Sequence, residues 1–270
     1  MTQYSFDART HFETIAMVRD CPQAPTSRLK RILGLSSVGF LLLLLTGCGS
    51  TTVFQSSFNA TALGASTGTV VIPQGSVVTV STPPNATGYW AKIQRAAPPG
   101  SPISTLQCNL SQVQQTGSYS FLAVLYIPSP IRLTNRDATA PSISNPLEPT
   151  NPDATVEFDT SAQSGPPSQS FLHLDFTPNN TVRINDDDNQ VFGTFPRDKS
   201  FTLAVTMEIT STSATAHLNL IGSGASGTKD VNINNVPLSF PQQFGEVQFY
   251  MGFPWNGWFY VTDILVTRKK

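Results

Sequence analysis

Two carboxylates one residue apart are the first side chains in this sequence that could carry out chemistry. Glu157 and Asp159 flank Phe158 in a segment whose polar and apolar residues alternate as in a β-strand. Alternate residues of a strand point to one face, so both carboxylates would project together. His173 and Asp175 have the same spacing in a second predicted strand. If the two strands pair, a histidine and three carboxylates converge as an acid–base or metal-binding group; otherwise they form solvated polar faces.

A second group of candidates lies in an aromatic segment near the C-terminus. Trp255 and Trp258 flank an Asn-Gly pair, which is a strong signal for a tight hairpin turn. Two indole rings placed in this way suit stacking on the rings of a sugar. Tyr260 and Tyr89 are expected to belong to the same ligand surface. The alternative is that these rings cover one end of the hydrophobic core.

The run Asp186-Asp187-Asp188 offers the hard oxygen ligands that Ca²⁺ prefers. It also lies where a turn is needed between apolar segments that end at Ile184 and resume at Val191, and Asp is a frequent turn residue. The glycine spacing of a calcium loop is missing here. The sequence therefore favours a turn over a calcium site, and we expect no metal or other cofactor.

The segment before Cys48 has the parts of an export signal. A basic cluster at 28–31 precedes the uncharged stretch Ile32–Gly47, whose 16 residues are fewer than the roughly 20 that cross a bilayer comfortably. Leu45-Thr46-Gly47-Cys48 then resembles the lipobox of bacterial lipoproteins. That resemblance implies that the Cys48 sulfur receives a diacylglycerol, that a peptidase cuts before Cys48, and that the new amine is acylated with a chain such as palmitate. The alternative is a short transmembrane anchor that is never cleaved.

A lipid on Cys48 would hold the chain on a membrane of the bacterial cell envelope. Gly49 rather than Asp follows the cysteine, which by analogy with enteric bacteria favours the outer membrane over the inner one. Either Met1 or Met17 could be the true start. We expect a leader and signal peptide over 1–47, the lipidated cysteine and a Ser/Thr/Gly-rich tether over 48–68, and one folded domain over 69–270.

The composition and periodicity of residues 69–270 predict an all-β domain. Charged residues are only 12% of the chain, with 21 Pro and 18 Gly, which suits short strands and turns rather than long helices. Phe201–Ile209 alternates apolar and polar residues, whereas Phe121–Ile127 is apolar throughout, as in a strand covered on both faces. Strands of both kinds indicate two antiparallel sheets packed face to face. A turn of helix is expected near Leu106–Gln115, and a long surface loop over Pro128–Pro152.

The predicted strands follow one another at short intervals. They are Thr69–Ile72, Ser76–Ser81, Tyr89–Arg95, Ser118–Ile127, Ala154–Thr160, Ser170–Phe176, Thr181–Ile184, Ser200–Thr210, Ala214–Ile221, Lys229–Ile233, Gly245–Met251 and Trp258–Thr267.

Three segments together resemble the concanavalin A-like lectin/glucanase superfamily, in particular its laminin-G-like members. They are Phe54–Asn59 with the following Leu63-Gly64, the strand–turn–strand series from Ser170 to Gly222, and the closing strand Gly257–Val266. The resemblance is one of pattern and spans most of residues 53–267. It implies a two-sheet antiparallel jelly-roll β-sandwich that binds sugar or protein ligands on its concave face or at its loop rim.

The same resemblance bears on catalysis. Glucanases of this superfamily use Glu-x-Asp followed shortly by a second Glu, but Thr160, Ser161 and Ala162 follow Asp159 here. Retaining hydrolysis needs two carboxyl groups, so the mechanism lacks an obvious acid. We therefore expect a non-catalytic domain that binds carbohydrate or an envelope protein. The alternatives are an atypical glycoside hydrolase or lyase that uses Glu157, Asp159 and His173, and a purely structural envelope protein.

Charge and cysteine content exclude other functions. The first 48 residues hold five basic and three acidic side chains, which leaves 11 basic and 14 acidic side chains for the rest of the chain. No basic field attracts nucleic acid, so no nucleic-acid partner is expected. If Cys21 is removed with the leader and Cys48 is lipidated, Cys108 has no disulfide partner. We expect Cys108 to be a small buried apolar residue.

Overall fold

The structure is a computed structural model, and it describes residues 49–94, 103–114, 116–129, 153–160, 170–185, 187–210, 213–233, 244–251 and 257–269. All of these residues fall in one compact unit, Gly49–Lys270. Their regular structure consists of strands. The strands are β1 (Ser50–Ser56), β2 (Ala65–Thr67), β3 (Thr69–Val71), β4 (Val77–Ser81), β5 (Trp90–Gln94), β6 (Thr105–Gln114), β7 (Gly117–Tyr126), β8 (Ala154–Asp159), β9 (Ser170–Phe176), β10 (Thr181–Ile184), β11 (Asp187–Thr194), β12 (Ser200–Ile209), β13 (Ala214–Ile221), β14 (Thr228–Ile233), β15 (Phe244–Tyr250) and β16 (Trp258–Lys269).

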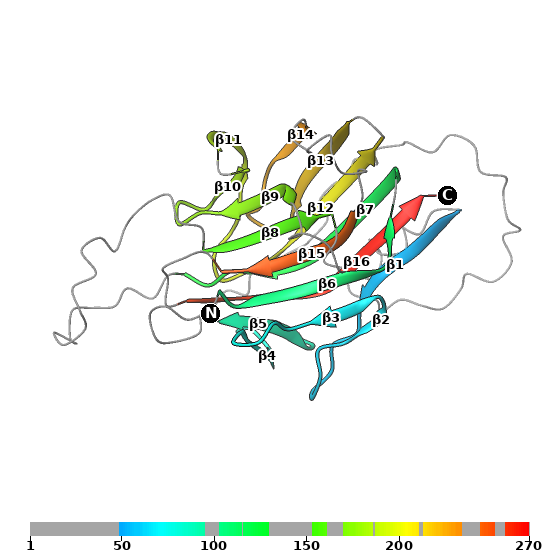
Figure 1. The fold of residues 1–270 in the computed structure, drawn as a ribbon. Coiled ribbons are helices and arrows are strands. Elements are labelled where there is room, and N and C mark those ends of the chain that lie inside the picture. Colours follow the sequence, from blue (N-terminus) through cyan, green and yellow to red (C-terminus); the bar gives the residue numbers. More distant parts are fainter. Residues whose placement is uncertain are drawn as a thin grey trace, which may run out of the picture. The chain divides into compact units, whose positions relative to one another are not determined.

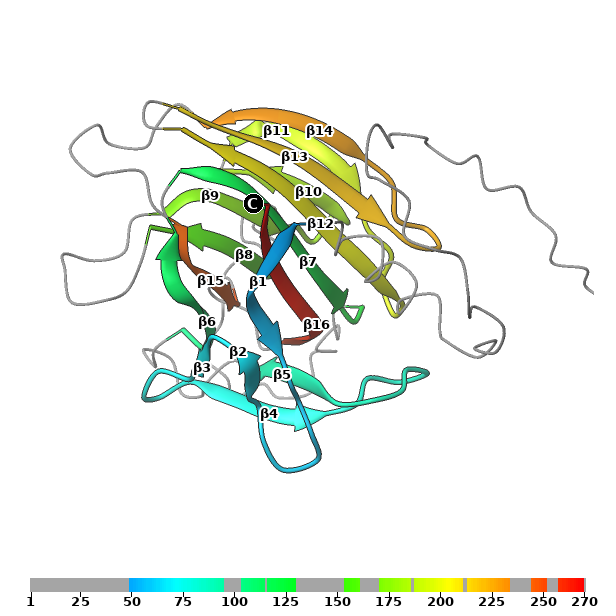
Figure 2. The same cartoon turned by 90° about the vertical axis from the view of Figure 1, so that its right-hand side faces the viewer.

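The strands form two antiparallel sheets that lie face to face (Figures 1 and 2). Sheet A has the order β14-β13-β12-β7-β16-β1-β2, and β5 pairs with β16 and carries β4. Sheet B has the order β11-β10-β9-β8-β15-β6-β3. Each strand pair is antiparallel, so the predicted all-β, two-sheet antiparallel sandwich is confirmed.

The chain crosses between the sheets in the manner of a jelly roll. The connection from β6 to β7 and that from β15 to β16 both lead from sheet B to sheet A. Within sheet B, β6 pairs with β15, and within sheet A, β7 pairs with β16. Segments far apart in sequence therefore lie side by side in the centre of both layers, which is how residues near the C-terminus come to line the same face as β8.

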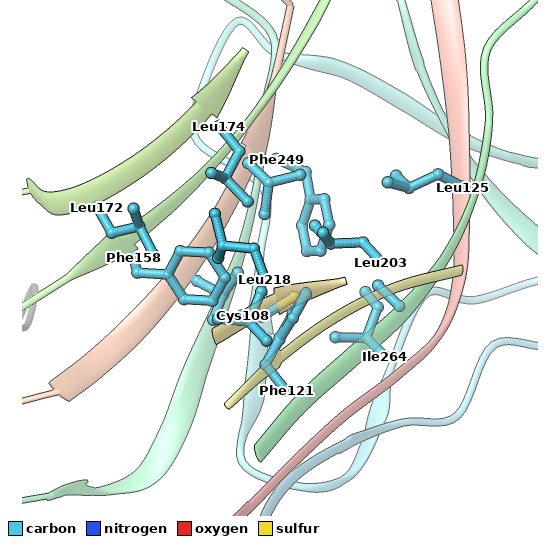
Figure 3. Close-up of a cluster of buried hydrophobic side chains, with 14 of the residues drawn as sticks. Cys108, Phe121, Leu125, Phe158, Leu172, Leu174, Leu203, Leu218, Phe249 and Ile264 are labelled. Atoms are coloured by element: carbon cyan, nitrogen blue, oxygen red, sulfur yellow. The ribbon is translucent and has the colours of Figure 1, made fainter. Parts of the chain in front are cut away.

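One hydrophobic core fills the space between the sheets. Figure 3 shows Cys108, Phe158, Leu172 and Phe249 of sheet B meeting Phe121, Leu203, Leu218 and Ile264 of sheet A. The Phe121 and Phe158 rings meet edge to face with their centroids 5.0 Å apart, a favourable aromatic geometry. Cys108 is a free buried thiol, as expected, and burial raises its pKa well above the usual range.

Two of the sequence patterns correspond directly to positions in the sheets. Residues Phe121–Ile127 are all buried, and β7, which holds most of them, lies between β12 and β16. In β12 the odd-numbered residues from Phe201 to Ile209 belong to the core, whereas Thr206 and Glu208 are exposed. The prediction of a doubly covered central strand and of a half-buried strand is confirmed at both places.

Two segments differ from the sequence-based expectation. Within the predicted tether over 48–68, Ser50–Ser56 and Ala65–Thr67 form β1 and β2, and β1 pairs with the closing strand β16. Its sequence is rich in Ser and Thr, but Val53 and Phe54 are buried in the core and fix it there. The helical turn expected near Leu106–Gln115 is wrong, because Thr105–Gln114 forms β6, whose alternate residues Leu106, Cys108 and Leu110 face the core.

The leader, Cys48 and residues 130–152 of the predicted long loop lie outside the described residues. Among the residues that the structure does describe, no helix has the length and apolar character needed to span a membrane.

Candidate functional site

The outer face of sheet B carries the polar side chains of the candidate site. In β8, Ala154, Val156 and Phe158 belong to the core, so the residues between them point outward. The same alternation applies to β6, β9, β10 and β15. The outward side chains, which we call the sheet B polar face, are those of Gln107, Asn109, Thr155, Glu157, Asp159, His173, Asp175, Arg183, Glu246, Gln248 and Tyr250.

The pairing of β8 with β9 brings together the two groups that the sequence could not align. Glu157 lies directly opposite His173, and Thr155 lies opposite Asp175. Side chains directly opposite on antiparallel strands have their Cβ atoms roughly 5 Å apart. The predicted convergence of the histidine with these carboxylates is therefore present. Glu157 and His173 are both half-buried, so both can meet a ligand.

Asp175 is the centre of a buried network behind this pair. The Arg183 guanidinium donates to Asp175 Oδ2 from Nη2 at 3.1 Å and from Nε at 3.3 Å. Thr155 Oγ1 donates to Asp175 Oδ1 at 2.8 Å, and His173 Nε2 lies 3.7 Å from Asp175 Oδ2. Thr155, Asp175 and Arg183 are all buried. If either Arg183 or Asp175 were removed, the remaining charge would be buried without a partner, which is costly. The network therefore holds Thr155 and Asp175 in fixed positions beside His173.

Glu246 is the site residue that sequence reasoning missed. It lies on β15, opposite Asp159 on one side and opposite Asn109 on the other. Two residues along the same strand, Gln248 donates from Nε2 to Asp159 Oδ2 at 2.6 Å. The sequence does contain a signal for this row of polar side chains. From Glu246 to Tyr250 polar residues alternate with Val247 and Phe249, which indicates that the polar ones share the outer face of a strand. Its partner strand β8 lies too far away in sequence for that pairing to be predicted.

Burial changes the protonation of the carboxyl groups. It raises the pKa of Asp159 to about 8, and repulsion from Glu157 and then Glu246 adds to the effect. It also raises the pKa of Glu246 to about 7, again with repulsion from Glu157. The Tyr250 pKa is raised by burial and by the adjacent Glu157, so its hydroxyl remains a donor. Buried carboxyls with raised pKa values beside an accessible Glu157 are typical of functional sites.

Some buried polar atoms of this face, and one of Ser170 opposite Asp159, have no hydrogen-bond partner among the described residues. They are Asn109 Oδ1, Asp159 Oδ1, Ser170 Oγ and both carboxyl oxygens of Glu246. Native proteins satisfy nearly all buried polar groups, so unpartnered oxygens gathered at one place are of the kind that ordered water or a bound group satisfies. In the described part of the chain, no three His, Cys, Asp or Glu side chains are placed to hold a metal ion.

The predicted aromatic ligand surface lies on the other sheet. Trp258 and Tyr260 begin β16 in sheet A, where Phe259 and Val261 face the core and these two rings face outward. The Lys92 ammonium lies 4.5 Å from the centre of a Trp258 ring. Tyr260 is buried and meets Tyr126 edge to face at 5.7 Å. The rings therefore face away from Glu157 and His173, across the full thickness of the sandwich.

The remaining predicted residues have different positions. Tyr89 is 48% exposed, and its backbone carbonyl accepts a hydrogen bond from Thr262 Oγ1 at 2.9 Å. Trp255 and Asp186 lie outside the described residues. Asp187 Oδ1 accepts from the backbone N–H of Asn189 at 2.9 Å, the local bond of an Asp turn, and this bond lowers the Asp187 pKa.

Comparison with known proteins gives likeness of structure but not of sequence. No protein-family model and no curated protein matches the chain. A protein of unknown function from Shewanella oneidensis superposes with a TM-score of 0.48 at 11% identity, over 89% of this chain and 97% of that one. Arcelin-5, a lectin-like defence protein from Phaseolus vulgaris, gives a TM-score of 0.45 at 6% identity, over 83% and 99%. Lectin II from Ulex europaeus gives 0.43 at 11% identity, over 81% and 97%.

Proposed function

We propose that the sandwich domain binds carbohydrate on the sheet B polar face. The observation that carries this proposal is the layered arrangement of that face. Glu157, His173 and Gln248 are half-buried and can meet a ligand, whereas Asp175 and Arg183 behind them are buried and hydrogen-bonded. A polar face that meets only water gains nothing from a buried ion pair, because such a pair contributes little net stability.

The chemistry of the exposed layer suits a sugar better than a protein. Carboxylate, amide and imidazole groups supply planar donors and acceptors that match the paired hydroxyls of a saccharide. Holding them in place before binding avoids the entropy cost of ordering them on the ligand. The centre of a protein–protein interface is instead depleted of charged residues and enriched in aromatic ones. An envelope protein is therefore the weaker candidate partner for this face.

The test is glycan binding by the full-length chain with variants on the two outer faces. Glu157→Gln and Gln248→Ala are expected to weaken binding to a polysaccharide panel by about tenfold or more, because each removes hydrogen bonds to the ligand. Trp258→Ala, on the outer face of sheet A, is the matched control and leaves the affinity unchanged. If Trp258→Ala lost binding while Glu157→Gln and Gln248→Ala retained it, the ligand would bind the aromatic surface predicted from the sequence instead.

A second candidate function is glycoside hydrolysis at the same face. The observation that favours it is Glu246, which supplies a third carboxyl beside Glu157 and Asp159 where the sequence lacked one. A glycosidase needs one protonated and one ionised carboxyl, and burial raises the pKa values of Asp159 and Glu246, which favours the protonated form of each. A lyase acting on uronates is disfavoured, since an acidic sugar brings no cation to these carboxyl groups. Release of reducing ends that Glu157→Gln abolishes even at saturating polysaccharide would establish hydrolysis. His173→Ala tests the histidine in the same assay.

For the membrane, the proposal is a lipid anchor at Cys48 and a location in the bacterial cell envelope, with the outer membrane favoured. It rests on the resemblance of 45–48 to the lipobox. Metabolic labelling with a palmitate analogue is expected to mark the wild-type chain and not Cys48→Ala. Density separation of the two membranes then locates the labelled protein. An unlabelled chain recovered from the cytosol would contradict the lipid anchor. A labelled chain that binds no glycan would favour the remaining alternative, a structural protein of the envelope.

A further inference from the structure

We propose that the sugar recognised by the sheet B polar face carries a free, protonated amine, and that Glu157, Asp159 and Glu246 form the acidic group that receives it. The ligand class is thus an amino sugar rather than a neutral or acidic one. This inference rests on the proposed carbohydrate-binding function.

Charge is the first support for an amine. Glu157, Asp159 and Glu246 cluster on two neighbouring strands, and no salt bridge within the described residues neutralises any of them. Arg183 faces the same side of the sheet but is paired with Asp175 at 3.1 Å. The other titratable groups on this face are His173, opposite Glu157, and Tyr250, which is uncharged. The cluster therefore has carboxyl groups in excess of cations.

Unpartnered buried oxygens are the second and independent support. Glu246 has no exposed surface, and neither of its carboxyl oxygens has a hydrogen-bond partner within the part of the chain that the structure describes. Asp159 Oδ1 also has no partner there. An ammonium group brings three N–H donors and a positive charge, whereas a hydroxyl brings one donor and no charge. Hydrogen bonds between charged partners are about twice as strong as neutral ones. The half-buried Glu157 is the contact point, and Asp159 and Glu246 lie behind it.

Two other ligand classes fit this face less well. Three suitably placed acidic, His or Cys ligands are lacking within the described residues, so a metal ion is not favoured. A uronic acid would add a fourth carboxyl group to three that no salt bridge within the described residues neutralises, and it brings no cation of its own. An amine instead takes the place of the protons that the buried pair would otherwise hold, so binding releases protons.

The experiment compares three oligosaccharides of equal length that share one backbone linkage. They are oligomers of chitosan, of chitin and of cellulose, which bear an amine, an acetamide and a hydroxyl at the same ring position. Titration calorimetry with the full-length chain is expected to give at least about tenfold tighter binding of the chitosan oligomer. Repeating the titration in buffers of different ionisation enthalpy is expected to reveal proton release with that oligomer alone.

Variants assign the preference to the acidic group. Glu157→Gln is expected to remove the tenfold preference while the weaker affinity common to all three oligomers persists. Asp159→Asn is a second variant that is expected to reduce the proton release, because Glu246 is then the remaining carboxyl group with a raised pKa. Melting curves establish that both variants are folded. Glu208→Gln is the matched control, because it makes the same substitution at an exposed carboxylate on sheet A.

The outcomes separate the inference from the function beneath it. Equal affinity for the chitosan and cellulose oligomers overturns the amine preference and leaves carbohydrate binding in place. Absence of binding to all three overturns both. A chitosan preference that survives Glu157→Gln overturns the assignment to this acidic group.

Discussion

The outer faces of the two sheets each carry a cross-strand pair of a basic side chain and an aspartate, in different surroundings. Asp175 and Arg183 are cross-strand partners on β9 and β10, and their side chains are only 3% and 7% exposed. His217 and Asp230 are cross-strand partners on β13 and β14, with 54% and 88% of their side chains exposed. The atoms meet at 3.1 Å in the first pair and 2.7 Å in the second. Their geometry is similar, and their solvation differs.

That difference in burial distinguishes the outer face of sheet A from the face of sheet B for which we propose a ligand. An exposed pair contributes little because water and salt screen it. A buried pair costs desolvation and is kept where it fixes a conformation. We interpret Asp175–Arg183 as the support that holds Thr155 and His173 in place beside Glu157. A third pair, Arg197 with Asp153, has intermediate exposures of 9% and 13%, so the three pairs form a series in burial.

The largest effect is expected at the most buried pair. Arg183→Met leaves the Asp175 carboxylate buried without a cation, which should lower the free energy of unfolding by about 3–5 kcal/mol. Urea denaturation monitored by circular dichroism measures this loss. Adding Asp175→Leu to Arg183→Met is expected to restore much of the stability, because no charge then remains buried. A single-variant loss as small as that of an exposed pair would remove the distinction between the two faces.

Arg197→Ala should fall next in the series. Arg197 pairs with Asp153, donates to Asn180 Oδ1 at 2.6 Å, and donates to the backbone carbonyls of Pro128 and Thr177 at 3.0 Å each. Its loss leaves these acceptors partly unsatisfied, and we expect about 2 kcal/mol lower stability.

Urea denaturation is again the measurement, with Arg197→Lys as the control for charge alone. Lysine retains the charge but not the planar fork that reaches several acceptors at once, so it is expected to recover less than half of the loss. If Arg197→Lys had the stability of the wild type, the positive charge of Arg197 alone would account for its contribution.

The acidic cluster predicts how stability depends on pH. The folded-state pKa values of Asp159 and Glu246, about 8 and about 7, lie above those of the unfolded chain. The folded protein therefore binds more protons between about pH 4 and pH 8, and its stability falls as the pH rises through that window. Replacing Glu246 with Gln should make the fall shallower by about 1 kcal/mol per pH unit between about pH 5 and pH 7.

Denaturant midpoints measured across this range test that slope. Glu208→Gln, at an exposed carboxylate of sheet A, is expected to leave it unchanged. A slope in Glu246→Gln identical to that of the wild type would mean that Glu246 is ionised in the folded state.

The two faces also differ in how far the sequence predicts them. Alternation in 201–209 and 170–176 predicts which side chains face outward, and this is confirmed in β12 and for most of β9. It predicts the spacing of Glu157 and Asp159 on one face, but not their neighbours, because register between strands depends on the whole sheet. Glu246 is the clearest case, since the pairing of β15 with β8 in sheet B places it beside Asp159, and these strands are far apart in sequence. The prediction of a tether over β1 is wrong because only Val53 and Phe54 of this strand are buried, and the Ser and Thr residues around them give no strand pattern.

The smallest effect is expected at the exposed pair, and it completes the comparison. His217→Ala and Asp230→Ala should each change the free energy of unfolding by less than about 0.5 kcal/mol, because solvent already stabilises both groups. Whatever difference remains at low salt should vanish in high salt, where exposed charges are screened, whereas the Arg183→Met loss should persist. Urea denaturation at the two salt concentrations measures both. A loss at His217 as large and as salt-resistant as that at Arg183 would show that burial does not set the value of these pairs, and the interpretation of the sheet B polar face as a supported ligand site would lose its basis.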